Sequence, residues 1–394
     1  MKLRYLIPFF DSSTQDWALE ARLLRWITFL WLAIGLAVMF SASYAVADAR
    51  FDDGLHYFKI QLVWISIGMV GFNILVHSPL RMVLGWASWV VVVLLGLLLL
   101  TLIPGLGIST NGATRWLAIG SVGIQPSELM KPFLVLQSAR IFGQWNQLSW
   151  RVRITWIAIF CLVLVGILLQ PNLSTTALCG MMIWLIALAA GLPYSYLFGA
   201  AATGLMAAIA SVSIKTYQRR RLISFLNPWK DEAGDGYQLI QSLLAIGSGG
   251  LTGTGFGLSQ QKLFYLPIQD TDFIFAVFAE EFGFLGCMLL FLMLATYATI
   301  ALKVAIKTTQ PVHRLVAIGV MVLMVGQALL NIGVATGALP TTGLPFPLIS
   351  YGGSSMISSL LTAGLLVRVA RESGAEVLPM RSRRTEQTEG NASF

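Results

Sequence analysis

The sequence predicts an all-α polytopic membrane protein. Its 394 residues are 56% hydrophobic and only 11% charged, whereas a water-soluble chain needs roughly 25% charged residues to cover its surface. The apolar residues come in runs of about 20, the length of helix that spans a bilayer. Cys161, Cys179 and Cys287 lie inside such runs and are too widely spaced for a metal motif or a disulfide framework, so they are interpreted as packing residues.

Ten apolar runs are long enough to be transmembrane helices. They lie at residues 23–46, 57–76, 83–103, 127–143, 154–170, 173–191, 193–213, 274–302, 313–336 and 352–370. Lys and Arg gather at alternate ends of these runs, which predicts that those ends and both termini face the cytoplasm. The net charge of +8 therefore reflects membrane topology, and no nucleic-acid partner is expected. Residues 1–22 are expected to form a cytoplasmic segment, 23–371 the transmembrane domain, and 372–394 a disordered cytoplasmic tail.

The outer segments between the helices are rich in Gly, Pro and uncharged polar residues, most clearly at 104–126, 214–273 and 337–351. Irregular backbone at membrane depth is tolerated only where protein buries it or water lines it. We therefore expect the chemistry at the outer face, covered by the long outer loop 214–273 between the seventh and eighth helices. The G-T-G-F-G motif at 253–257 lacks the preceding strand and the later acid of a nucleotide-binding loop, so that function is rejected.

Four acidic residues lie close together at the start of the eighth helix: Asp270, Asp272, Glu280 and Glu281. Asp272 either complements the free N–H groups and the dipole of the helix N-terminus, or is a partly desolvated general base with a raised pKa. These two interpretations are compatible. Glu280 and Glu281 lie deeper, where a carboxylate is costly unless paired. Adjacent helical positions point about 100° apart, so at most one of the two is expected to face a given cavity.

Basic residues in the other outer segments are candidate partners for these acids. Arg115 is either an interfacial cation or a ligand for phosphate oxygens. Glu128 and Lys131 share one helix face, and they form either a structural ion pair inside the bundle or, through Lys131, part of the phosphate site. Lys215 and the cluster at 219–221 give the long outer loop a basic patch that suits anionic headgroups or a pyrophosphate.

Five motifs together resemble the SEDS family, whose FtsW and RodA branches serve bacterial division and elongation. They are N-G-A-T-R-W (111–116), Q-P-S-E-L-M-K (125–131), G-Y-Q-L-I-Q-S (236–242), T-D-F-I-F-A-V-F-A-E-E-F-G (271–283) and P-F-P-L-I-S-Y-G-G-S-S (345–355). The motifs occur in order, and the resemblance covers residues 23–371. It implies the SEDS fold of ten helices and a peptidoglycan glycosyltransferase that polymerises lipid II at the outer face of the bacterial cytoplasmic membrane.

The resemblance assigns the catalytic role to Asp272, the aspartate of the T-D-F motif. The predicted substrate-binding residues are Arg115, Lys131, Glu128, Arg219, Arg221 and Gln241, and the predicted supporting residues are Asp270, Glu280 and Glu281. A carboxylate would take the proton of the attacking sugar hydroxyl, and cations would neutralise the departing undecaprenyl pyrophosphate. The acids could also recruit a divalent cation, Mg or Mn.

Two departures from the family pattern concern the charge near this site. Asn172 stands where the family usually has an acid, which argues against an ionic role for that turn. Asp270 stands where the family often has histidine, and a second acid beside Asp272 would raise the pKa of Asp272 by repulsion.

The resemblance leaves several functions open. Q-K-L-F-Y-L-P at 261–267 favours the division branch and a place at the septum, whereas F-L-N-P and A-I-G-S-G-G favour the elongation branch. We expect the division branch, with elongation as the alternative. A lipid II flippase or a silent scaffold are the alternatives, but the polar motifs concentrate on one face, which favours an enzyme. The expected partners are a class B penicillin-binding protein transpeptidase and other division proteins.

Overall fold

The computed structural model describes residues 12–110, 113–120 and 122–390, so Lys2, Arg4 and the N-G turn at 111–112 lie outside the described residues. The elements, in chain order, are η3 Ser12–Asp16, α1 Leu19–Phe51, α2 His56–His77, α3 Leu80–Leu100, β1 Gly107–Thr110, β2 Ala113–Ile119, β3 Val122–Ile124, α4 Pro126–Gly143, η4 Trp145–Gln147, α5 Trp150–Leu169, α6 Leu173–Ala189, α7 Tyr194–Ile214, α8 Thr216–Leu226, η5 Pro228–Asp231, α9 Tyr237–Ser248, α10 Ile274–Lys307, α11 Pro311–Met321, the π-helical η6 Val322–Gly326, α12 Gln327–Ala335 and α13 Gly353–Gly390.

All ten expected transmembrane helices are present among the described residues, the ninth as α11, η6 and α12 in continuous succession. By length and composition alone, eight of the ten could cross a membrane. The other two are α6, which has only 17 residues, and α4, which carries Glu128, Lys131 and Arg140. α13 continues to Gly390, so the backbone of most of the predicted disordered tail is helical here. Arg and Glu in that tail have good helix propensity. The predicted division into segment, domain and tail stays a prediction.

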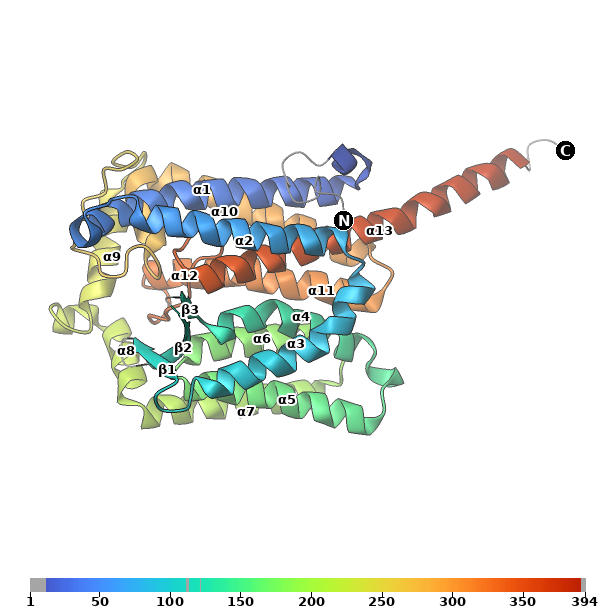
Figure 1. The fold of residues 1–394 in the computed structure, drawn as a ribbon, viewed down its shortest axis with the longest axis horizontal. Helices are drawn as coiled ribbons and strands as arrows, with labels where there is room; N and C mark the ends of the chain where they lie inside the picture. The colour runs from blue at the N-terminus through green and yellow to red at the C-terminus, as the bar shows by residue number, and fades with distance from the viewer. Residues whose placement is uncertain (1–11, 111–112, 121, 391–394) are drawn as a thin grey trace.

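The helices differ in how much protein surrounds them (Figure 1). α13 packs against α2, α4, α1 and α11, and 78% of the apolar 18-residue stretch that could cross a membrane is buried. α7 packs against α6 and α8, and only 11% of its corresponding apolar stretch is buried. The start of α1 and the end of α13 lie at one end of the bundle, whereas the β-strands, α8 and α9 lie at the other (Figure 1). The second end corresponds to the predicted outer face.

The long segment predicted at 214–273 connects α7 to α10, and it contains the short helices α8 and α9 in addition to irregular backbone. α9 buries an apolar face against the bundle with Leu239, Ile240 and Ala245, whereas the described apolar residues of α8 are exposed or half-buried. Ser242 Oγ also donates to the Ala335 carbonyl, 2.7 Å away, which ties α9 to the end of α12. The preceding outer segment forms a three-stranded antiparallel sheet, β1-β2-β3.

The connection from α12 to α13 re-enters the bundle as irregular backbone. Leu344, Phe346 and Leu348 on this connection are each about 1% exposed. A side-chain carbon at Gly35, in the middle of α1, would lie 2.1 Å from the Leu348 carbonyl oxygen, so only glycine admits this close approach. Protein therefore surrounds this non-helical segment at depth, as the sequence analysis requires.

Candidate active site

Asp272 lies on the short segment that enters α10, facing the connection between α12 and α13. A side-chain carbon at Gly343, which has φ +76°, would lie 3.5 Å from Asp272 Oδ2 and 3.9 Å from Arg221 Nη1. The carboxylate and the guanidinium therefore approach the same point above this glycine. The Asp272 carboxylate accepts no hydrogen bond from the described residues, and the N-cap of α10 is Phe273, so Asp272 does not cap the helix by its side chain.

Three consecutive backbone carbonyls hold the Asp272 segment in place. The Asp270 carbonyl accepts from the Tyr351 N–H at 2.8 Å, and the Thr271 carbonyl accepts from Ser350 Oγ at 2.6 Å. The Asp272 carbonyl accepts from Asn331 Nδ2 at 2.8 Å. Since buried hydrogen bonds are costly to leave unmade, this arrangement fixes the backbone that carries the carboxylate. We call residues 270–272 and these three donors the carbonyl clamp.

The surroundings of Asp272 favour its neutral form. Burial raises the pKa of Asp272 from 3.8 to about 6, Arg221 and Arg115 lower it, and Asp270 raises it. Asp270 contributes in the direction expected from the sequence, although burial is the larger cause. The pKa of Asp270 itself is also raised by burial, against the lowering effects of its own backbone N–H and of Arg50. The two acids thus lie in a partly desolvated region that favours their protonated forms.

Cations from two elements line a cavity beside this acid. This cavity, of about 130 Å³, is lined by Arg115 of β2, Asn172 at the start of α6, Arg221 of α8 and Thr341 of the α12–α13 connection, among others. Arg115 donates to the Gln170 and Pro171 carbonyls, at 3.1 and 2.5 Å, and Arg221 donates to the Thr341 carbonyl at 3.2 Å.

The basic cluster at 219–221 is only partly directed at the site. Arg221 is half-buried, whereas Arg219 and Arg220 are exposed. Lys215 donates to the Leu168 carbonyl at 2.8 Å, and its pKa is lowered first by burial and then by Arg115. Lys215 is therefore the third cation near the cavity, which the sequence analysis had placed only in the general basic patch.

The predicted substrate ligands Glu128 and Lys131 lie away from the cavity as a buried ion pair. Their charged atoms are 2.7 Å apart, and the side chains are 4% and 3% exposed. Lys131 also donates to Gln327 Oε1 at 3.0 Å, and Gln327 Nε2 donates to the Pro345 carbonyl at 2.6 Å. Of the two interpretations of this pair, the geometry corresponds to a structural ion pair inside the bundle. The pair is buried away from the outer cavity, and Gln327 links it to the backbone of the α12–α13 connection.

Gln241 and Asn172 have simpler environments. Gln241 is half-buried on α9 and is not among the residues that line the cavity. Asn172 caps α6, since its Oδ1 accepts from the Thr175 N–H at 3.3 Å. An uncharged cap at this turn agrees with the expectation that it has no ionic role.

α10 is interrupted at Gly283, where φ is +64° and ψ is −166°. The glycine-rich segment after α9 pairs with the broken turn. The Glu280 and Glu281 carbonyls accept from the Thr254 and Gly255 N–H groups, and the Phe284 and Leu285 N–H groups donate to the Gly250 and Leu251 carbonyls. A side-chain carbon at Gly253 would lie 2.1 Å from the Glu281 carbonyl oxygen. The glycines that superficially suggest a nucleotide loop therefore permit close backbone pairing with a broken helix.

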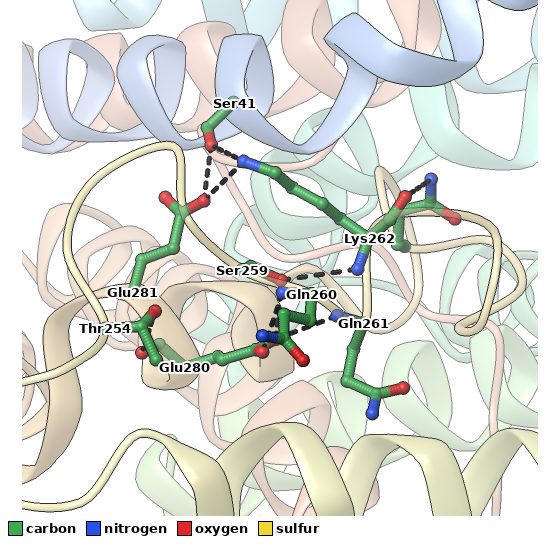
Figure 2. Close-up of polar contacts among 9 residues, drawn as sticks. Ser41, Thr254, Ser259, Gln260, Gln261, Lys262, Glu280 and Glu281 are labelled. Atoms are coloured by element: carbon green, nitrogen blue, oxygen red, sulfur yellow. Dashed lines mark hydrogen bonds and ion pairs between the residues drawn. The ribbon is translucent and has the colours of Figure 1, made fainter.

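Figure 2 shows that Glu280 and Glu281 point in different directions and hold the same outer segment. Glu280, about 1% exposed, accepts from Ser259 Oγ at 2.5 Å and from the Gln260 N–H at 2.8 Å. Glu281 pairs with Lys262 Nζ at 2.7 Å, and both groups contact Ser41 Oγ of α1. We call Ser41, Lys262 and Glu281 the loop anchor, because together they join the segment before Asp272 to α1 and α10.

The four acids do not converge on one metal-binding position. Glu280 and the Oε1 atom of Glu281 are engaged by the donors just described, and Glu281 Oε2 is buried with no hydrogen-bond partner among the described residues. Asp270 and Asp272 are the two carboxylates left near the cavity. Among the described residues, no three His, Cys, Asp or Glu side chains are grouped to hold a metal ion.

Several residues that build the site were not found from the sequence: Ser41, Lys262, Asn331 and Ser350. One usable signal was the presence of polar side chains in apolar helices, which are expensive unless they have partners. Gln327 and Asn331 lie one turn apart on α12 and both bind the α12–α13 connection. The role of Lys262 had no such signal, because its partners come from distant parts of the chain.

The FtsW, RodA and SpoVE family model, described as cell cycle protein, matches residues 21–375. The probable peptidoglycan glycosyltransferase FtsW of Synechocystis sp. is 56% identical over 96% of each chain. Stage V sporulation protein E of Bacillus subtilis is 37% identical over 88% of this chain and 96% of its own.

Solved structures with the same fold agree with these sequence matches. A chain of a peptidoglycan synthase complex that coordinates polymerization and crosslinking superposes with a TM-score of 0.70 at 27% identity, covering 89% of this chain and 97% of that chain. The rod shape determining protein RodA of Thermus thermophilus gives a TM-score of 0.64 at 27% identity, covering 89% of this chain and 96% of its own.

Proposed function

The chain belongs to the FtsW, RodA and SpoVE family of cell cycle proteins, and from that premise we propose that it is a peptidoglycan glycosyltransferase that polymerises lipid II. Relatives named FtsW, at 56% and 49% identity over more than 90% of the chain, favour the division branch over the elongation branch. The observation that carries the proposed chemistry is the carbonyl clamp, which holds Asp272 opposite Arg221.

Asp272 acts as the general base. A sugar hydroxyl attacks the anomeric carbon of the lipid-linked disaccharide, a new C–O bond forms, and the bond to the undecaprenyl pyrophosphate breaks. The hydroxyl proton passes to Asp272, whose pKa of about 6 leaves it mostly ionised at neutral pH yet basic enough to take the proton. The pyrophosphate leaves with the bonding electrons.

The cations beside the cavity stabilise that leaving group. Arg115 and Arg221 line the cavity, and Lys215 lies close to Arg115. Positive charge fixed where negative charge develops lowers the barrier without further reorganisation. Arginine also matches phosphate oxygens with two parallel N–H donors.

A divalent cation, Mg or Mn, would be held by Asp270, Asp272 and the pyrophosphate of the substrate. Mg²⁺ commonly takes one or two carboxylates and completes its coordination with water and substrate phosphate, so two protein carboxylates are compatible with such a site. Such a cation would share the neutralisation of the leaving group with the arginines.

The protein crosses the membrane several times, and the end with Asp272 faces outward, with both termini in the cytoplasm and the protein at the division septum. The clustering of Arg81, Arg151 and Lys303 near the opposite end supports this orientation. A class B penicillin-binding protein would crosslink the strands, with other division proteins assembling around the pair. A similarly folded chain in a complex that couples polymerization to crosslinking supports such a partner.

The test is polymerisation of lipid II by Asp272→Asn, compared with wild type at equal membrane abundance and with the transpeptidase present. Loss of the proton acceptor should lower the rate by about 10²–10⁴-fold. The backbone clamp uses the Asp272 carbonyl rather than its side chain, so Asn should leave the fold intact. Glycan strands made at a near-normal rate by this variant would remove Asp272 from the mechanism.

A further inference from the structure

A large groove opens at the end of the bundle opposite Asp272. It has a volume of about 830 Å³ and lies among the α4–α5, α6–α7 and α10–α11 connections. Its lining includes Trp145, Trp150, Arg153, Tyr196 and Arg314. A volume of this size is within the roughly 300–1,000 Å³ of small-molecule sites. None of the described residues that bind Asp272 or line the outer cavity contributes to this groove.

The groove wall is built by a defined helix ending. α6 ends in a Schellman turn, in which the Gly191 N–H donates to the Leu188 carbonyl and the Leu192 N–H donates to the Ala187 carbonyl. Gly191 takes the positive φ, +79°, that this turn needs. Pro193 is the N-cap of α7, and both Pro193 and Tyr196 line the groove. A hydrogen-bonded turn therefore forms this wall of the groove.

The charge of the groove is positive. Two arginines line it, and no Asp or Glu is among the described lining residues. Arg153 is oriented by a hydrogen bond from its Nε to the Leu148 carbonyl, 3.0 Å away, and by the face of Trp145, 5.1 Å from its guanidinium carbon. Arg314 is exposed and forms no ion pair with the described residues. Both guanidinium groups thus keep N–H donors available for an anion.

The rim of the groove has the character of a bilayer interface. Trp150 is 67% exposed and Tyr196 63% exposed, and such rings concentrate at the level of lipid headgroups. Ile154 and Ile157 continue along α5 from this rim and are also exposed. An occupant that places an anionic group against the arginines and an apolar chain along α5 would match both parts.

We propose that this groove binds an anionic phospholipid of the adjacent leaflet, with its phosphate between Arg153 and Arg314 and an acyl chain along Ile154 and Ile157. Basic pockets between helices at the membrane surface are suited to such headgroups. The aromatic rim supplies contact for the glycerol region, and the absence of acids from the described lining removes a repulsive partner. The site is independent of the proposed glycosyltransferase chemistry.

The test is lipid binding by the full-length protein in phosphatidylcholine nanodiscs, titrated with phosphatidylglycerol or cardiolipin of matched acyl chains and read by native mass spectrometry. Wild type should bind the anionic lipids at least tenfold more tightly than added phosphatidylcholine. Arg153→Gln with Arg314→Gln should remove that preference. Arg314→Gln alone, at an exposed position with little risk to folding, should weaken anionic-lipid binding several-fold.

Arg151→Gln is the matched control, since Arg151 is exposed on the same helix turn but does not line the groove. It should change the affinity by less than about twofold. Equal affinity of wild type for neutral and anionic lipids, or equal loss in the Arg151 control, would overturn the proposal. Binding of lipid II in place of phosphatidylglycerol, lost in the double variant, would assign the groove to the substrate and would also overturn it.

Discussion

The acidic and basic halves of the candidate active site are held very differently. Asp272 lies between the buried α12–α13 connection and the start of α10, and three buried or partly buried donors fix its backbone. Arg221 lies on α8, which follows the peripheral helix α7. In α10, 39% of the apolar 18-residue stretch is buried, whereas in α7 only 11% of the corresponding stretch is buried.

This difference corresponds to what each group does in the proposed reaction. Proton transfer requires the base to lie within hydrogen-bond distance of one hydroxyl, so the Asp272 carboxylate must be held within a narrow range of positions. A pyrophosphate presents several oxygens, and charge stabilisation by several cations depends less on any one of them. The site thus combines a rigid acid with cations drawn from three separate elements, β2, the α7–α8 junction and α8.

The largest expected effect is on the rigid side, at the loop anchor. Glu281→Gln would leave the Lys262 ammonium buried without its carboxylate, and breaking a buried pair in this way costs about 3–5 kcal/mol. Stability and polymerisation should fall together, because the anchored segment leads directly to Asp272. Thermal unfolding in detergent and lipid II polymerisation measure the two effects.

Two variants serve as controls for the anchor. Lys262→Met combined with Glu281→Gln removes both charges and should recover part of the lost stability. Asp53→Asn breaks the exposed pair with Lys59 and should leave unfolding nearly unchanged. If Glu281→Gln were as stable as wild type, the segment that carries Asp272 would not depend on the Lys262–Glu281 pair.

On the basic side, Arg221→Gln should affect the reaction more than the fold. We expect the turnover rate to fall by about 10–100-fold, less than the 10²–10³ typical of a single essential oxyanion donor, because Arg115 and Lys215 remain. The free energy of unfolding should change by less than about 1 kcal/mol, since the described contacts of the side chain include one hydrogen bond to a backbone carbonyl.

Arg220→Gln is the matched control for Arg221, because Arg220 is exposed on the same helix. Its turnover should stay within about twofold of wild type, as for most exposed charges. If Arg220→Gln and Arg221→Gln reduced turnover equally, the basic side would act through its net charge and not through the placement of Arg221.

The sequence predicted the helical spans because they depend on local patterns, and the catalytic role of Asp272, which also comes from a local motif, stays a prediction. Each apolar run is long enough to identify a helix by itself, and the T-D-F motif is contiguous. The roles of Glu128 and Lys131 could not be assigned in this way, since their i, i+3 spacing fits a buried pair and a substrate site equally. The loop anchor joins residues 41, 262 and 281, and the carbonyl clamp joins 270–272 to 331 and 350–351. Such contacts are set by tertiary packing, which a single sequence does not display.

Keeping Asp272 ionised should have a cost in stability that depends on pH. Its pKa in the fold, about 6, lies above the ordinary value of 3.8, so folding favours the protonated form. The stability that the protonated form contributes is fully present below about pH 4 and is lost as the pH rises through 6. Asp272→Asn, which carries no charge, should therefore be more stable than wild type at pH 7.5, by on the order of 3 kcal/mol.

That advantage should disappear at pH 4, where the wild-type carboxyl group is also neutral. Thermal unfolding of both proteins at pH 4, 5, 6 and 7.5 measures the difference, and Asp48→Asn, at an exposed acid on α1, is the control for removing a carboxylate charge. A variant that is inactive yet more stable at neutral pH would show that the rigid side of the site keeps its charged base at a cost in stability. A difference that does not vary with pH would mean that Asp272 is solvated in the fold, and that its activity as a base does not come from burial.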